Sequence, residues 1–134
     1  MIKKIIAVTL VALFAATFMQ QPATHAAEQK PAATEPAYTY TAKSGDSYSV
    51  LARKAIQTYG IVNNVKLSLA QILAAENALT AQAGSPDLSE GQVVSLTQSN
   101  VKSAMDAAKK LSPADEAAWN TYVPYVNFDT RSNG

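Results

Sequence analysis

An uncharged apolar stretch near the start of the chain limits how much of the sequence can form a folded core. Residues 5–19 contain no charged side chain, and two lysines precede them. Thr24 and Ala26 then supply small side chains at the −3 and −1 positions of a cleavage site. A basic start, a short apolar run and small residues in this order are typical of a secretory signal peptide. We therefore predict that residues 1–26 are cleaved and that the protein is exported to the periplasm, cell wall or extracellular space.

The alternative is that this N-terminal segment is kept as an uncleaved anchor. Its apolar run is shorter than the roughly 20 residues that a membrane-spanning helix needs, so we expect no stable membrane span after cleavage. No cysteine follows the run, and this excludes a bacterial lipoprotein.

Removal of residues 1–26 changes the chemistry available to the chain. The remaining 108 residues carry 9 basic and 10 acidic side chains, a net charge of −1 against +1 for the whole chain. This balance argues against a nucleic-acid partner. His25 is the only histidine and the chain has no cysteine, so catalytic triads, Cys–His pairs and His- or Cys-based metal sites are excluded from the remainder. We predict no enzyme, no metal and no cofactor.

The mature chain has a modest supply of core-forming residues. Of its 108 residues 47 are apolar, and 19 of these are alanine, which suits one small domain. Residues 27–37 contain two prolines, mixed charges and no large apolar side chain. Such a composition does not offset the entropy of ordering, so we predict a disordered linker there.

The first part of the domain predicts a strand followed by a helix. Residues 38–42 alternate tyrosine with threonine, which favours a short strand. Gly45 suits a turn, and Asp46 or Ser47 can cap a helix. Apolar residues then recur at helical spacing, at Tyr48, Leu51, Ala52, Ala55, Ile56 and Tyr59. We expect Gly60 to end this helix and its outer face to carry Arg53, Lys54 and Gln57.

A second helix and a second strand follow. Ser68 can cap a helix in which Leu69, Ile72, Leu73 and Ala75 or Glu76 share a face. We place the end of this helix near residues 77–79. A breaker-rich stretch at 84–87 leads into an apolar strand at 93–96. Two distant short strands must pair to be stable. We therefore predict an α+β fold of βααβ order, with two helices on one face of a two-stranded antiparallel sheet.

The C-terminal part is helical in pattern. One apolar stripe falls on Val101, Ala104, Met105, Ala108 and Leu111. Ser112 followed by Pro113 signals the start of a shorter helix to about residue 120. We expect the aromatic residues Trp119, Tyr122 and Tyr125 to pack these helices on the open face of the sheet or, alternatively, to form an exposed contact patch, and residues 129–134 to be frayed.

Three sequence blocks resemble the lysin motif, or LysM, family. The first is Tyr38–Thr39–Tyr40 followed by Gly45–Asp46–Ser47 and Leu51–Ala52; the second is Ile72–Leu73 with Asn77; the third is Leu88–Ser–Glu–Gly–Gln–Val–Val–Ser–Leu96. The blocks occur in family order over residues 38–97. The copy is longer than usual at residues 60–66 and 78–87, and in this it is similar to LysM copies of bacterial pilus-assembly and cell-pole scaffold proteins.

The resemblance implies a ligand and a site. LysM modules hold N-acetylglucosamine-containing glycan in a shallow groove between the loop after the first strand and the loop after the second helix, largely through backbone groups. Carried over, the first loop is Gly45, Asp46 and Ser47, and the second is Asn77, Ala78, Leu79 and Thr80. The resemblance thus implies a non-catalytic module for peptidoglycan or a related glycan, with residues 98–134 as a helical extension.

Several of these residues also have a purely structural interpretation. The turn at residues 45–47 is needed to start the helix whether or not a ligand binds. Tyr38, Tyr40, Tyr48 and Tyr59 suit core-edge packing better than sugar stacking. The acidic pair Asp115–Glu116 is explained by a helix start better than by a catalytic dyad.

The alternative function is that of an envelope interaction module. In that case the fold no longer binds sugar, and residues 101–128 recruit a protein partner or self-associate. Deleting residues 97–134 distinguishes a separate module, which leaves a stable glycan-binding domain, from a structural cover, whose loss unfolds it.

Overall fold

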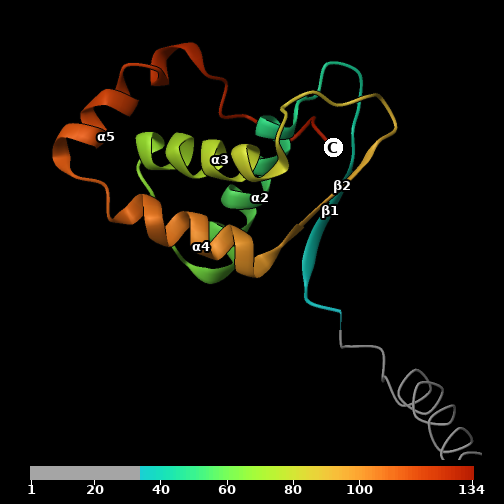
Figure 1. Cartoon of the computed structure of the whole chain (residues 1–134), viewed down its shortest axis with the longest axis horizontal. Helices are drawn as coiled ribbons and strands as arrows, with labels where there is room; N and C mark the ends of the chain where they lie inside the picture. Colours follow the sequence, from blue (N-terminus) through green and yellow to red (C-terminus); the bar gives the residue numbers. More distant parts are fainter. Residues whose placement is uncertain (1–33) are drawn as a thin grey trace, which may run out of the picture. The chain divides into compact units, whose positions relative to one another are not determined.

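The computed structural model describes residues 34–134. Its elements in chain order are β1 (Ala37–Thr41), α2 (Tyr48–Asn63), α3 (Leu69–Ala83), β2 (Val93–Thr97), α4 (Gln98–Lys109), α5 (Pro113–Asn120) and the short 3-10 helix η1 (Val123–Tyr125). Figure 1 labels the two strands and the α-helices. The predicted signal peptide and most of the predicted linker lie outside the described residues.

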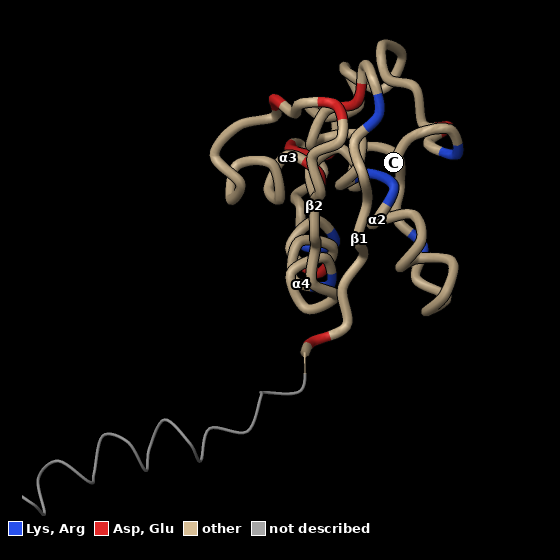
Figure 2. Tube along the Cα trace, turned by 90° about the vertical axis from the view of Figure 1, so that its right-hand side faces the viewer, with Lys and Arg blue, Asp and Glu red and all other residues tan. Residues whose placement is uncertain are grey.

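The two strands pair as the sequence predicts. β1 and β2 are antiparallel, with Tyr38 opposite Leu96 and Tyr40 opposite Val94, and Figure 2 shows them running side by side. Val94 and Leu96 are buried, while Val93 and Ser95, which alternate with them along the strand, are exposed, as a one-sided sheet requires. The α+β fold with a βααβ core and a C-terminal helical extension is confirmed.

The folded domain begins before Tyr38. The carbonyl of Pro36 accepts a hydrogen bond of 2.9 Å from Gln98 N, and Glu35 Oε1 accepts one of 3.0 Å from Ser99 N. The last residues of the predicted linker, 35–37, therefore contact the start of α4, and a negative side chain at a helix N-terminus is electrostatically favourable there.

α2 does not end at Gly60. The helix continues to Asn63, and Asn64 closes it in the left-handed conformation with φ of 53°. A Cβ at Gly60 would lie 2.8 Å from the carbonyl oxygen of Val65. The glycine is therefore present because the chain turns back closely over the helix, and the prediction that it terminates the helix is wrong.

α3 runs past the predicted end at residues 77–79. Its start is a capping box in which Ser68 Oγ accepts from Gln71 N at 3.2 Å and Gln71 Oε1 accepts from Ser68 N at 2.9 Å. Its end is Gly84, which closes the helix in the left-handed conformation with φ of 87°. Residues 77–83 contain good helix formers and no breaker, so the helix continues through them.

The core is shared between the βααβ unit and α4. Its largest fully buried side chains are Leu51, Ile56, Leu79, Val101 and Met105. α3 packs on both α2 and α4, while α2 and α4 also contact β2. α4 therefore completes the core, although it lies outside the LysM-like region of the sequence.

α5 and η1 pack on α3 rather than on the open face of the sheet. α5 begins as predicted, with Ser112 as the N-cap and Pro113 in the first turn. Tyr122 and Tyr125 are 58% and 88% exposed, and the rings of Trp119 and Tyr122 lie tilted with centroids 6.0 Å apart. The predicted packing of these aromatics on the sheet is wrong, and the alternative of an exposed patch fits Tyr122 and Tyr125.

Candidate functional site

The loop after β1 is a tight turn that starts α2. Lys43 N donates to Asp46 Oδ2 at 2.9 Å and Asp46 N donates to the Lys43 carbonyl at 3.0 Å. Gly45 has φ of +86°, a conformation that favours glycine. Ser47 Oγ accepts from Val50 N at 3.3 Å. Of the two predicted caps, Ser47 is the residue that caps the helix, and Asp46 closes the turn.

The loop between α3 and β2 lies directly beside this turn. Tyr48 N donates to the Pro86 carbonyl at 2.8 Å, Gly91 N donates to the Ala42 carbonyl at 2.7 Å, and Ala42 N donates to the Gln92 carbonyl at 2.8 Å. Residues 84–87 and 89–92 are exposed. The structure therefore brings together the loop after the first strand and the loop after the second helix, and we name them the paired loops (residues 43–47 and 84–92).

The second set of predicted site residues does not lie in a loop. Asn77, Ala78, Leu79 and Thr80 are all part of α3. Leu79 is buried in the core, while Asn77 is exposed on the helix surface. Thr80 is nearest the first loop, since its Oγ1 lies 3.0 Å from Ser49 Oγ on α2. Assigning residues 77–80 to a groove-forming loop was wrong because the helix is longer than the pattern indicates.

The tyrosines of the LysM-like blocks pack against the core edge. Tyr38, Tyr40, Tyr48 and Tyr59 are all partly buried against the core cluster. Burial raises the pKa of the Tyr38, Tyr40 and Tyr48 hydroxyls. This matches the structural interpretation of the four residues better than sugar stacking.

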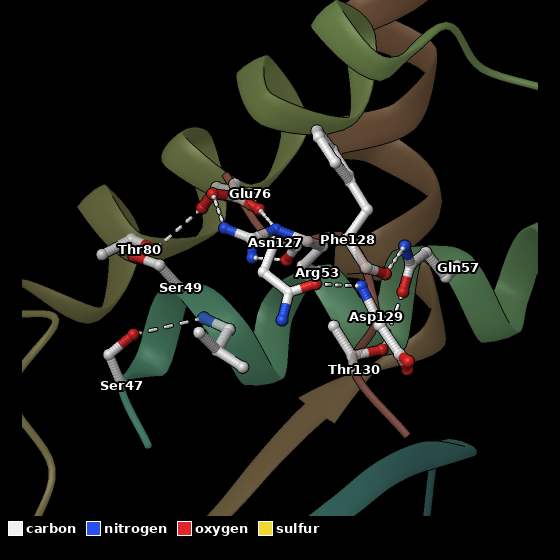
Figure 3. A network of polar contacts seen from close by, with 11 residues as sticks. Ser47, Ser49, Arg53, Gln57, Glu76, Thr80, Asn127, Phe128, Asp129 and Thr130 are labelled. Atoms are coloured by element: carbon white, nitrogen blue, oxygen red, sulfur yellow. Dashed lines mark hydrogen bonds and ion pairs between the residues drawn. The ribbon is translucent and has the colours of Figure 1, made fainter. Parts of the chain in front are cut away.

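The outward face of α2 is covered by residues 127–134, which we name the return segment. Arg53 Nη1 donates to the Asn127 carbonyl at 2.7 Å, and Gln57 Nε2 donates to the Phe128 carbonyl at 2.8 Å. Thr130 Oγ1 donates to Gln57 Oε1 at 2.7 Å. Figure 3 shows this network of contacts. The predictions that this helix face is outer surface and that the chain end is frayed are therefore wrong.

The return segment ends at the first of the paired loops. Asn133 Nδ2 donates to Asp46 Oδ1, and Gly134 N donates to Asp46 Oδ2 at 3.0 Å. Burial raises the pKa of Asp46, but hydrogen bonds from Asn133, Lys43 and Gly134 together lower it by more, so the net pKa is below the ordinary value. The sequence offered no signal for this contact, because residues 129–134 contain no apolar pattern.

The return segment also forms one wall of a groove of about 740 Å³ beside the C-terminal half of α2. Apolar side chains line it from α2, the connection to α3, α3, α4 and the return segment: Ile56, Ile61, Val65, Leu67, Ile72, Met105 and Phe128. Sequence reasoning missed this groove because its lining comes from distant parts of the chain, the return segment among them.

The acidic side chains of the described residues have structural settings. Among residues 34–134 no group of three His, Cys, Asp or Glu side chains is placed to hold a metal ion. The acidic pair of α5 serves its helix start and a neighbour: Asp115 N donates to Ser112 Oγ at 3.1 Å, and Glu116 Oε1 accepts from Ser68 Oγ at 2.6 Å. Asp115 and Glu116 thus have the helix-start setting that the sequence predicts.

Within the described part of the chain no helix is both long and apolar enough to cross a membrane. Comparison of the chain with protein-family models, with curated proteins and with solved structures finds no match. The likeness to the LysM family therefore rests on the sequence blocks in residues 38–97 and on the βααβ order of the fold.

Proposed function

We propose that this protein is an exported, non-catalytic module that binds N-acetylglucosamine-containing glycan, with peptidoglycan as its main ligand, at the paired loops. The observation that carries the proposal is the contact between the loops, with Tyr48 N donating to the Pro86 carbonyl at 2.8 Å. The LysM resemblance implies a glycan site between these two loops. The second loop is residues 84–92 in place of residues 77–80.

The chemistry of the paired loops suits acetamido groups. An acetamido group carries one N–H donor and one carbonyl acceptor, and exposed loop backbone offers both kinds of partner. Ser44, Gly45 and residues 84–87 are exposed. The Pro86 carbonyl and the amides of Gly84 and Asp87 already have partners within the chain, so the backbone groups offered to a ligand are those of Ser44, Gly45 and Ser85. A single shallow site gives no avidity, and we expect modest affinity for a soluble glycan and stronger retention on a polymer that presents many sites.

Retention on purified peptidoglycan tests this function. The chain without residues 1–26 is incubated with insoluble peptidoglycan at low salt, and the bound fraction is measured after sedimentation. Ser44→Trp places a bulky ring at the paired loops without removing the Ser47 cap, and we expect it to lower the bound fraction. Ser103→Trp, on the exposed side of α4, is the matched control and leaves retention unchanged. Absence of retention of the unmutated chain at low salt contradicts the proposal.

A second candidate function is protein binding through the C-terminal extension, within residues 101–128. The exposure of Tyr125 (88%) and Tyr122 (58%) favours it, because aromatic side chains are enriched where proteins bind one another. The double variant Tyr122→Ser, Tyr125→Ser separates the two functions. If the C-terminal extension binds a protein partner, this variant abolishes capture of the partner from an envelope extract. If the paired loops bind the glycan, the same variant leaves retention on peptidoglycan intact.

A further inference from the structure

The first of the paired loops carries a side-chain site that is already filled by the chain itself. Both carboxylate oxygens of Asp46 accept hydrogen bonds from the return segment, one from the side-chain amide of Asn133 and one from the backbone N–H of Gly134. Two lysines donate to carbonyls of the same segment: Lys43 Nζ to Ser132 O at 2.9 Å, and Lys54 Nζ to Asn133 O. Each amide in the site is therefore matched by a charged partner.

An apolar wall completes this site. A Cβ on Gly134 would lie 3.1 Å from the ring and Cβ of Tyr40 and 3.2 Å from Leu51 Cδ2, so the glycine fits closely against both side chains. Lys54 Nζ lies 5.3 Å from the centre of the Tyr40 ring, a cation–π contact that fixes the ammonium beside the wall. The site therefore combines charged hydrogen-bond partners with an apolar wall, a polarity that suits a small amide next to an apolar group.

The chemistry of this site matches an acetamido group as well as it matches asparagine. A carboxylate accepts an amide N–H, an ammonium donates to a carbonyl, and a charged partner makes such bonds stronger than neutral ones. An acetamido group presents an N–H, a carbonyl and a methyl group, and the aromatic wall of Tyr40 can hold the methyl. Asn133 and Gly134 thus occupy a place that an N-acetylated sugar can use.

We propose that Lys43, Asp46 and Lys54 form an amide-binding site, and that Asn133 and Gly134 fill it as an internal ligand that an N-acetylated glycan displaces. The inference rests on the proposed function, since it places the acetamido group of the glycan in this site. When a protein's own segment fills its binding site, the apparent affinity for a ligand equals the intrinsic affinity multiplied by the fraction of time that the site is open. Glycan affinity is therefore set by how firmly the return segment docks.

Two variants release the internal ligand while leaving the network at Arg53 and Gln57 in place. Deletion of residues 132–134 removes the occupying residues but keeps residues 127–131. Gly134→Val deletes no residue, and its side chain would collide with Tyr40 and Leu51. Ser132→Ala is the matched control, because Ser132 contributes only its backbone carbonyl to the site.

Binding of N,N′,N″-triacetylchitotriose, followed by amide chemical shifts, tests the inference. We expect the two release variants to bind about three- to tenfold more tightly than the unmutated chain, with Ser132→Ala unchanged. The fully deacetylated trimer, which lacks amides, should bind all forms weakly and gain nothing from release.

The outcomes separate this inference from the function on which it rests. If the unmutated chain and both release variants bind with equal, measurable affinity, Asn133 and Gly134 do not act as an internal ligand, and the proposal of glycan binding is unaffected. Absence of binding by every form, with shifted Gly45 and Asp46 amides showing that the segment has been released, overturns the proposed function itself.

Discussion

Arg53 on α2 and Glu76 on α3 form a buried two-pronged ion pair. Arg53 Nε lies 2.5 Å from Glu76 Oε2, and Nη2 lies 2.7 Å from Oε1. Each residue is 7% exposed. The third guanidinium nitrogen donates to the carbonyl of Asn127, so one side chain links the two central helices to the return segment (Figure 3).

Removal of the acidic partner should destabilise the domain strongly. Glu76→Ala leaves the buried Arg53 without its counter-charge, and breaking a buried pair in this way costs about 3–5 kcal/mol. Urea unfolding followed by circular dichroism measures the loss. The double variant Arg53→Met, Glu76→Leu should recover part of it, because no uncompensated charge remains. An exposed pair, Lys102 and Asp106, is the control, and Asp106→Ala leaves the unfolding midpoint unchanged.

Docking of the return segment should weaken in acid. The folded pKa of Asp46 lies below its ordinary value of 3.8, so its contribution to docking is fully present above that pH and is lost as the pH falls through the folded pKa. The side-chain amide signal of Asn133, which donates to Asp46 Oδ1, reports this step locally. A local signal is needed because the free energy of unfolding also depends on Glu76. Burial raises the pKa of Glu76 by more than Arg53 lowers it, so the contribution of Glu76 to stability is lost as the pH rises, opposite to that of Asp46. An Asn133 side-chain amide signal that does not move below pH 4 contradicts the Asp46 contact.

Gly60→Ala should destabilise the domain, against the usual rule for helices. Alanine normally stabilises a helix interior by about 1 kcal/mol relative to glycine. Here the added Cβ lies 2.8 Å from a backbone oxygen, and such overpacking costs typically about 1–3 kcal/mol. We therefore expect the free energy of unfolding of Gly60→Ala to fall. A rise would contradict the close contact between Gly60 and the Val65 carbonyl.

Deletion of residues 98–134 should unfold the remaining chain. α4 contributes the buried side chains of Val101, Ala104, Met105 and Ala108 to the same core as α2 and α3. Their loss exposes apolar surface that nothing else covers. Thermal unfolding of this deletion should show no cooperative transition, whereas deletion of residues 132–134 should keep one. A cooperative transition in the larger deletion contradicts a shared core.

The sequence predicted the regular elements and missed the long-range contacts of the return segment. Strand alternation at Tyr38–Thr41 and the Ser112–Pro113 start signal are local, so each could be predicted from neighbouring residues. The end of α2 could not be predicted in this way, because Gly60 allows the backbone of Val65, which lies beyond the helix, to pass close to it. The return segment was missed for the same reason: Asn133 meets Asp46 across 87 residues, through polar groups that leave no periodic pattern.

Of the two loops of the candidate site, the sequence placed the first correctly and the second incorrectly. Gly45, Asp46 and Ser47 lie in the loop where the LysM resemblance places them. The second loop was misplaced because alanine- and leucine-rich residues 77–83 extend the helix, and the loop begins only at Gly84.

A titration of the isotope-labelled chain with N,N′,N″-triacetylchitotriose tests the central claim most directly. The account predicts saturable amide shifts at Gly45 and Ser47 together with residues 85–89, larger at equal ligand concentration once residues 132–134 are deleted. Shifts confined to the surface around Tyr122 and Tyr125, or no shifts in either form, would contradict glycan binding at the paired loops.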